Sequence, residues 1–229
     1  MMFYGYGANI LQGTTLTFGL LVVTTALSLM IGILGAVCKL SRLAALRGLA
    51  TLYTTAIRAV PDLVLMLLIF FNLQIMLNAI CDALGLALIE IDAFSAGVVT
   101  LSFIYGAYMT ETFRGAIRAV PRGQLEAARS TGMSGPQIFR MVTFPQMMRH
   151  ALPGLNNNIQ VIIKATALVS IIGLTDLISI TQQAGQATQK NFFFSLLAAA
   201  IYLIFTTVTL YILSHLDRKF SRGVREGRI

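Results

Sequence analysis

Residues able to bind metals, form disulfides or bind nucleotides are few and widely separated in this chain. Its 229 residues include only 9 Asp and Glu, 2 His and 2 Cys. His150 and His215 have no carboxylate or cysteine at ligand spacing, so the sequence predicts no metal site. Cys38 and Cys81 end two different apolar stretches, where packing is a better interpretation than a disulfide. The nucleotide-binding pattern G-x-x-x-x-G-K-[ST] does not occur in the sequence, so the chain is not expected to be an enzyme that hydrolyses ATP.

A second set of residues is polar but stands inside apolar segments. Burying such groups in hydrocarbon is costly, so each indicates either a contact with a transported ligand or a hydrogen bond between helices. For Lys164 a head group reaching the membrane surface is a further interpretation. The candidates for a substrate path are Asn72, Gln74, Tyr105, Tyr108, Thr110, Glu111, Lys164, Thr166 and Ser170. A transported cation would also need a compensating carboxylate, and the segments offer Asp62, Glu111 and Asp176.

The segments that hold these residues are long enough to cross a membrane. The chain is 56% hydrophobic and 11% charged, whereas about 25% of residues are charged in a soluble domain. Residues 1–38, 63–81, 93–110 and 191–216 carry no charge, and each can hold a helix of about 20 residues. We therefore predict an all-α membrane protein, a single domain over residues 1–229. Its five spans are expected at about 14–37, 61–81, 93–112, 157–181 and 192–216.

Basic residues follow alternate connections between these spans. Lys and Arg occur in residues 39–58, 112–156 and the C-terminal tail, whereas residues 82–92 contain none. This distribution predicts an outside N-terminus and a cytoplasmic C-terminus. The net charge of +8 is thus explained by topology, and we expect a lipid bilayer rather than nucleic acid as its partner.

The six residues AIRAVP occur twice, at 56–61 and 116–121, with unrelated flanks. A match this short does not indicate a duplicated domain. Both copies lie on the predicted cytoplasmic side, and Pro61 and Pro121 are predicted to mark helix boundaries.

The predicted cytoplasmic loop, about 121–150, has the pattern of two short helices around a turn. Residues 124–131 favour a helix, and Gly132 can adopt the left-handed conformation that closes it. Ser134 and Gln137 fit a capping box that begins a second helix, which Pro145 is predicted to end. This second helix presents the apolar residues Ile138, Phe139, Met141 and Val142 near Arg129 and Arg140. Such an apolar patch beside charge is typical of a protein interface, although an amphipathic hairpin on lipid is an alternative.

This loop resembles the EAA loop of ABC-importer permeases. Glu126-Ala127-Ala128, Gly132 and Val142-Thr143-Phe144-Pro145 keep the spacing E-A-A-x3-G-x9-I-x-L-P, with Val and Phe replacing the usual Ile and Leu. The resemblance extends over nearly the whole chain. Residues 53–70, 106–128 and 164–177 are similar to the polar amino acid subfamily. Residues 58–63 and 144–154 resemble its HisQ-type branch, the permease subunits of importers for histidine, lysine, arginine and ornithine.

The resemblance implies a type I ABC-importer permease fold in a bacterial inner membrane. It implies import of polar L-amino acids, chiefly basic ones or related opines, driven by ATP and Mg bound to a separate ATPase. No cofactor is expected on this chain. The implied partners are a second, different permease, two ATPase subunits and an extracytoplasmic binding protein. The residues implied to couple the chain to the ATPase are Glu126, Ala127, Ala128, Gly132, Ser134, Ile138, Phe139, Arg140 and Pro145.

Two other functions fit the sequence less well. An ion-gradient-driven secondary carrier or channel often shows inverted repeats, but this sequence shows none, and five spans do not divide into equal halves. A non-transporting membrane scaffold is disfavoured by the polar residues within the spans.

Overall fold

The computed structural model describes residues 2–88 and 90–221, and within these ranges every regular element is a helix. Five helical segments are long and apolar enough to cross a membrane, which confirms the predicted number. They are α1 (Gly7–Leu40), α3 (Asp62–Ala83), α4 (Ala93–Ala119), a continuous path over Gly135–Ile172, and α9 (Asn191–Phe220). The path Gly135–Ile172 comprises α6 (Gly135–Ile138), η2 (Phe139–Thr143), α7 (Phe144–Ala165) and η3 (Thr166–Ile172). The remaining elements are η1 (Met2–Gly5), α2 (Ala44–Ala59), α5 (Arg122–Ser130) and α8 (Leu177–Thr188).

The structure differs from the predicted fourth span, 157–181. The helical path ends at Ile172 and Gly173 turns the chain with φ 94°, a conformation that glycine adopts without steric cost. Asp176 then caps α8 by accepting a hydrogen bond from the Ser179 amide at 2.9 Å. The turn is hidden in the sequence because apolar residues continue on both sides of it.

The predicted connection at residues 39–58 is largely helical. Residues 44–59 form α2, which packs beside α1 and α4. Val60 is extended and Pro61 precedes the first residue of α3. The second copy of AIRAVP, at residues 116–121, has the same arrangement, because α4 ends at Ala119 and Pro121 precedes α5. Both prolines therefore mark helix boundaries, as predicted.

Helix α4 forms the centre of the core, and α1 and α7 pack against it. Glycines permit the close approach of α1. A Cβ atom on Gly32 would lie 2.4 Å from Cβ of Met109, and one on Gly35 would lie 2.2 Å from Oγ1 of Thr110. Helix α7 runs antiparallel to α4, since Gly154 lies against Thr112 and Val169 of η3 lies against Gly97.

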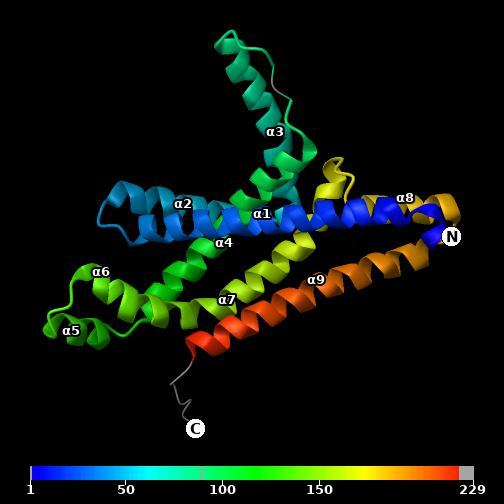
Figure 1. Ribbon diagram of the computed structural model, residues 1–229. Coiled ribbons are helices and arrows are strands. Elements are labelled where there is room, and N and C mark those ends of the chain that lie inside the picture. The colour runs from blue at the N-terminus through cyan, green and yellow to red at the C-terminus, as the bar shows by residue number, and fades with distance from the viewer. Residues whose placement is uncertain (1, 89, 222–229) are drawn as a thin grey trace.

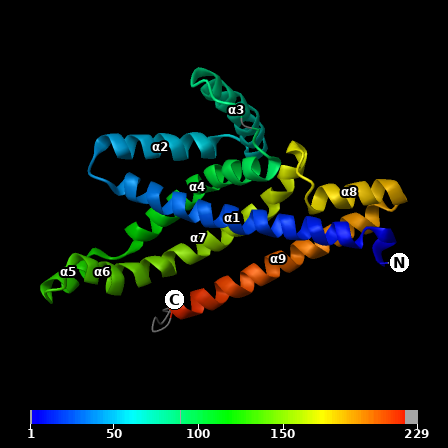
Figure 2. The ribbon, with the colours of Figure 1, turned by 45° about the horizontal axis from the view of Figure 1, so that its top comes forward.

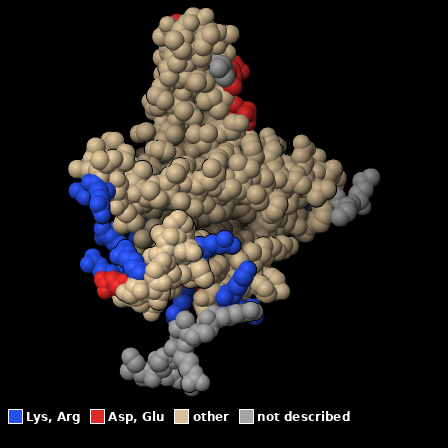
Figure 3. Space-filling view, turned by 60° about the vertical axis from the view of Figure 1, so that its left-hand side comes forward, with Lys and Arg blue, Asp and Glu red and all other residues tan. Residues whose placement is uncertain are grey.

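Figures 1 and 2 show α1 and α9 running along the length of the molecule, with α3 projecting away from this bundle. Helix α8 lies beside the N-terminal part of α1. In Figure 3, Lys and Arg side chains gather on the end that carries α5 and α6, and a group of Asp and Glu side chains lies on the projecting part. In this view no Lys or Arg side chain lies on the projecting part, while one acidic group lies among the basic side chains at the other end.

Asp92 caps the start of α4, where α3 connects to it. Its Oδ1 atom accepts hydrogen bonds from the Ser95 and Phe94 amides at 3.0 Å each. Hydrogen bonding, chiefly from Ser95, holds the pKa of Asp92 below its usual value, because it stabilises the charged carboxylate.

Candidate functional site

Helices α5 and α6 form an elbow whose turn is built by local residues. Gly132 has φ 79° and closes α5, with the Gly132 amide bonded to the Arg129 carbonyl at 2.9 Å. Ser134 and Gln137 then make the predicted capping box, in which the Ser134 amide donates to Gln137 Oε1 at 2.8 Å. The predicted elbow geometry is therefore confirmed.

The surface of the elbow differs from the predicted surface at two residues. Ile138 is 8% exposed and Ala128 is 7% exposed, so both side chains offer little surface to a partner. Phe139 is 54% exposed and Met141 is 65% exposed, and these two carry the apolar surface. The predicted coupling residues Glu126, Ala127, Gly132, Ser134 and Arg140 are also exposed.

Pro145 does not end the second helix as predicted, because the helical path continues through it. The residues just before it, Phe139–Thr143, form a π-helical turn, and the Phe144 amide bonds to the Phe139 carbonyl. Pro145 follows in the first turn of α7, and its missing amide hydrogen leaves one carbonyl of the preceding turn without the usual helical donor. The elbow is thus joined to a transmembrane helix without a break.

A second group of residues surrounds Asp62 in the first turn of α3. Tyr105 donates a hydrogen bond to its Oδ2 atom at 2.8 Å, and Tyr108 donates to Oδ1 at 3.4 Å. Arg58 stacks on Tyr108, with Cζ 5.5 Å from the ring centroid. Within the part of the chain that the structure describes, no Lys, Arg or His forms an ion pair with Asp62. The structure therefore brings Tyr105 and Tyr108, two predicted path residues, together at Asp62. From the sequence, Asp62 was expected only as a carboxylate that could compensate the charge of a cation.

Glu111 has a different environment, because two cations of the chain bind it. Lys39 of α1 pairs with Oε1, and Arg114 pairs with Oε2 at 2.7 Å. Lys39 also donates to Thr54 Oγ1 of α2 at 2.7 Å. The Lys39 and Glu111 side chains are only 10% and 16% exposed. This arrangement ties α1, α2 and α4 together. The contact with Lys39 could not be predicted from a local pattern, because Lys39 and Glu111 are far apart in the chain.

Most of the other candidate path residues bond within their own helices. Thr110 is fully buried and donates to the Gly106 carbonyl at 2.8 Å. Thr166 and Ser170 donate to the carbonyls of Ile163 and Ala167 at 2.7 and 2.8 Å. On α3, Asn72 donates to the Leu68 carbonyl at 2.7 Å. These bonds lie within one helical path and are not the predicted bonds between helices; of the four, Thr166 also has a contact between helices, 3.4 Å from the Tyr202 hydroxyl of α9.

Gln74 ties α3 to the connection that follows it. Its Oε1 accepts from the Ile91 amide at 2.9 Å, and its Nε2 donates to Asn78 Oδ1 at 2.8 Å.

Helix α7 carries polar residues that the prediction passed over. Asn158 is buried and donates to Thr112 Oγ1 of α4 at 3.0 Å. Asn157 is exposed, Gln160 is half-buried, and Lys164 is exposed. The run N-N-N-x-Q at residues 156–160 was the available signal, since amides are rare in apolar spans.

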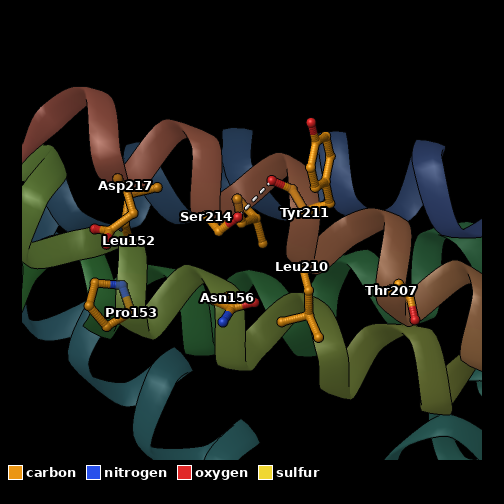
Figure 4. A pocket seen from close by; sticks show the side chains of 9 residues that line it. Leu152, Pro153, Asn156, Thr207, Leu210, Tyr211, Ser214 and Asp217 are labelled. Atoms are coloured by element: carbon orange, nitrogen blue, oxygen red, sulfur yellow. Dashed lines mark hydrogen bonds between the residues drawn. The ribbon is translucent and has the colours of Figure 1, made fainter.

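A groove of about 540 Å³ lies between α7 and α9 (Figure 4). Its polar lining comes from Asn156 on α7 and from Thr207, Tyr211, Ser214 and Asp217 on α9. Ser214 donates to the Tyr211 carbonyl at 2.9 Å within this wall. None of the predicted path residues lines the groove, so it is separate from the surroundings of Asp62.

Comparison with known proteins identifies relatives along the entire chain. Residues 28–222 match the family of the binding-protein-dependent transport system inner membrane component. The chain is 52% identical to the histidine/lysine/arginine/ornithine transport system permease protein HisQ of Escherichia coli K12, over 99% of each chain. It is 34% identical to the octopine transport system permease protein OccQ of Rhizobium meliloti, over 97% of this chain and 94% of the relative. A chain of a solved amino acid ABC transporter with histidines superposes with a TM-score of 0.76 and 32% identity, covering 93% of this chain and 95% of that chain.

These similarities extend to the fold, because the five candidate spans and the elbow belong to one all-helical chain that superposes on an ABC transporter chain. The partners of such a subunit are ATPase and binding-protein subunits. The chain therefore belongs to the family of binding-protein-dependent transport system inner membrane components, and it is a transport subunit of a bacterial ABC importer rather than an enzyme.

Proposed function

We propose that this permease imports basic L-amino acids, namely histidine, arginine, lysine and ornithine, or opines derived from them. Similarity to HisQ and OccQ supports these substrates. ATP and Mg bind the partner ATPase, and an extracytoplasmic binding protein delivers the substrate. The N-terminus lies outside and the C-terminus lies in the cytoplasm.

The observation that carries the basic-substrate proposal is the environment of Asp62. Two tyrosine hydroxyls orient its carboxylate, at 2.8 and 3.4 Å, without neutralising its charge. A half-buried carboxylate held in this way favours a cation, because attraction between charges is stronger in a low-dielectric site than in water. A guanidinium or ammonium side chain of the substrate supplies that cation.

Coupling to ATP hydrolysis is assigned to the elbow. The exposed Phe139 and Met141 form an apolar surface beside the exposed Arg140, which suits insertion into a groove of the ATPase. Because α6, η2 and α7 are continuous, a displacement of the elbow reaches the helix that carries Asn158 and Lys164.

The permease acts as a pair with a second, different permease. Support comes from α3, which projects from the bundle (Figure 1) and has only 11% of its most apolar window buried. In one chain Leu68, Phe71 and Ile75 of α3 are exposed, and a second permease covers this apolar face.

The test is uptake of labelled arginine into membrane vesicles supplied with the cognate binding protein. Histidine, lysine, ornithine and an opine are expected to compete, and glutamine is not. Asp62→Asn should reduce arginine uptake by about tenfold or more, since a charge-assisted interaction is lost. Asp82→Asn, which changes an exposed carboxylate at the other end of the same helix, is the matched control and should leave uptake unchanged. Competition by glutamine alone would refute the basic-substrate proposal.

A further inference from the structure

We propose that Phe144 and Phe220 hold the end of α9 on the elbow, so that α9 transmits displacements between the elbow and α8 at the opposite end of the molecule. This inference rests on the proposed coupling of the elbow to the ATPase and names two positioning residues for it. Figure 1 shows α9 running from α8 to the region where the elbow joins α7.

The contact at the elbow is a row of three aromatic rings. Phe139 lies on the exposed surface of the elbow, and its ring centroid is 6.1 Å from that of Phe144. The rings of Phe144 and Phe220 meet edge to face, with centroids 6.1 Å apart and an interplanar angle of 79°. Both separations lie in the range of attractive aromatic pairs. The row therefore joins the surface proposed for the ATPase to the last residue of α9.

The other end of α9 is anchored on α8. Phe194 of α9 is fully buried and packs in one cluster with Leu177 and Ala184 of α8. The turn between the two helices is closed, because the Lys190 amide bonds to the Gly185 carbonyl at 2.9 Å. The start of α9 and α8 are therefore expected to move together.

Between these two ends α9 is little buried. Only 6% of its most apolar window is buried, and its buried residues, Phe194 and Ala198, lie near α8. Its hydroxyl contact with η3, from Tyr202 to Thr166 at 3.4 Å, also lies in the half nearer α8. Grooves of about 540 Å³ lie beside α9, one against α7 (Figure 4) and one against α1 and α7. A helix held mainly at its ends can shift as one body.

Helix α9 is unbroken, whereas the path through α7 is interrupted. The 30 residues of α9 include neither Pro nor Gly, two residues associated with helix kinks. The path Gly135–Ile172 contains the π-helical turn Phe139–Thr143, Pro153 within α7 and the 3-10 segment η3. Each of these irregularities lets a helix bend, so a displacement of the elbow reaches the far end more fully along α9.

The two ends of α9 face different partners. In the proposed topology α8 lies on the outer side, where the binding protein delivers the substrate, and the elbow lies on the cytoplasmic side with the ATPase. Loss of the ring contact should leave the ATPase bound, because Phe139 and Met141 still form the exposed apolar surface. It should reduce the stimulation of ATP hydrolysis by the loaded binding protein.

The test measures ATP hydrolysis by the permease–ATPase complex in lipid vesicles, with and without the arginine-loaded binding protein. Phe220→Ala should reduce the stimulation about threefold to tenfold, since one aromatic pair is lost, and leave basal hydrolysis and ATPase copurification unchanged. Phe220→Tyr, which keeps the ring, should restore most of the stimulation. The double variant Phe144→Ala, Phe220→Ala should lower the stimulation no further than Phe144→Ala alone, because both substitutions remove the same contact.

A second measurement is hydrogen exchange of α8 with and without a non-hydrolysable ATP analogue. The analogue should change the exchange of α8 in the wild-type complex and in Phe220→Tyr, but not in Phe220→Ala. Leu203→Ala is the matched control, because it removes a 66% exposed apolar side chain of the same helix. It should leave both the stimulation and the response of α8 as in the wild type.

Stimulation and a response of α8 that survive in Phe220→Ala would overturn the proposal. Losses that Phe220→Tyr does not restore, or that Leu203→Ala reproduces, would overturn it as well. So would loss of the ATPase from Phe220→Ala, because Phe220 would then hold the complex together. A wild-type complex that the arginine-loaded binding protein does not stimulate, or a Phe139→Ala variant that keeps its ATPase, would instead contradict the proposed function.

Discussion

At the scale of single residues, the half-buried carboxylate groups of Glu111 on α4 and Asp62 on α3 have opposite environments. Glu111 is neutralised by Lys39 and Arg114 of the same chain, whereas Asp62 is held by neutral tyrosine hydroxyls. A carboxylate that already has two cations has little charge left for a ligand. We therefore propose a structural role for Glu111 and a role in substrate binding for Asp62.

Glu111→Gln should destabilise the permease and reduce the uptake of arginine and histidine equally. The substitution leaves two poorly exposed cations without their partner, which costs roughly 3 kcal/mol for a buried pair. The free energy of unfolding of the purified complex and vesicle uptake are the measurements. The double variant Lys39→Met, Glu111→Gln should be more stable than Glu111→Gln alone, because one uncompensated charge is removed. If arginine uptake alone falls and the free energy of unfolding is unchanged, Glu111 contacts the substrate instead.

Gly132→Val should uncouple the permease from its ATPase without preventing membrane insertion. The residue has φ 79° and no atom lies within 4 Å of a Cβ placed on it, so the cost is backbone strain of about 1–2 kcal/mol rather than a clash. The amount of permease in the membrane should be normal. The amount of ATPase that copurifies with it and the rate of uptake should both fall. Gly132→Asn is the control, because Asn tolerates the left-handed conformation. Transport at the wild-type rate in Gly132→Val would contradict the assignment of the elbow.

At the scale of elements, the elbow has an interior and a contact surface that substitutions should separate. Phe139→Ala removes an exposed ring, so it should weaken ATPase copurification while hydrogen exchange of α5 and α6 stays as in the wild type. Ile138→Ala removes a buried side chain and should destabilise the elbow by about 2 kcal/mol or more, which hydrogen exchange will report. If both variants lose the ATPase and show identical hydrogen exchange of α5 and α6, Phe139 and Ile138 do not divide into contact surface and interior.

At the scale of the whole molecule, the gathering of Lys and Arg side chains at one end (Figure 3) predicts its orientation in the membrane. Single cysteines replace Leu86, in the connection between α3 and α4, and Ser134, in the elbow; both residues are exposed. Native Cys38 and Cys81 are changed to serine. A membrane-impermeant maleimide should label the Leu86 position in intact spheroplasts and the Ser134 position only after permeabilisation. The reverse pattern would invert the proposed topology.

The projecting α3 also predicts that the active complex contains two different permeases. Native mass measurement of the active complex should give a transmembrane core of this chain and a second, related chain. An active complex with only copies of this chain would contradict the proposed heteromeric pair and leave the permease fold unaffected.

The sequence by itself determined the features that depend on neighbouring residues. Apolar stretches fixed the number of spans, Pro61 and Pro121 fixed two helix boundaries, and Gly132 with Ser134 and Gln137 fixed the elbow. Each depends on the backbone preferences of residues within one or two turns, which a local pattern records.

Only the tertiary structure decided which side chains meet. Lys39 and Glu111 are 72 positions apart, and Asp62 and Tyr105 are 43 apart. Their contacts depend on how α1 and α3 pack against α4. The packing of α5 against α6 and η2 likewise leaves Ile138 buried and Phe139 exposed. Residue types and spacing do not predict how each helix is rotated about its axis or how deep it lies relative to its neighbours. These are set by the close fit of side chains between helices.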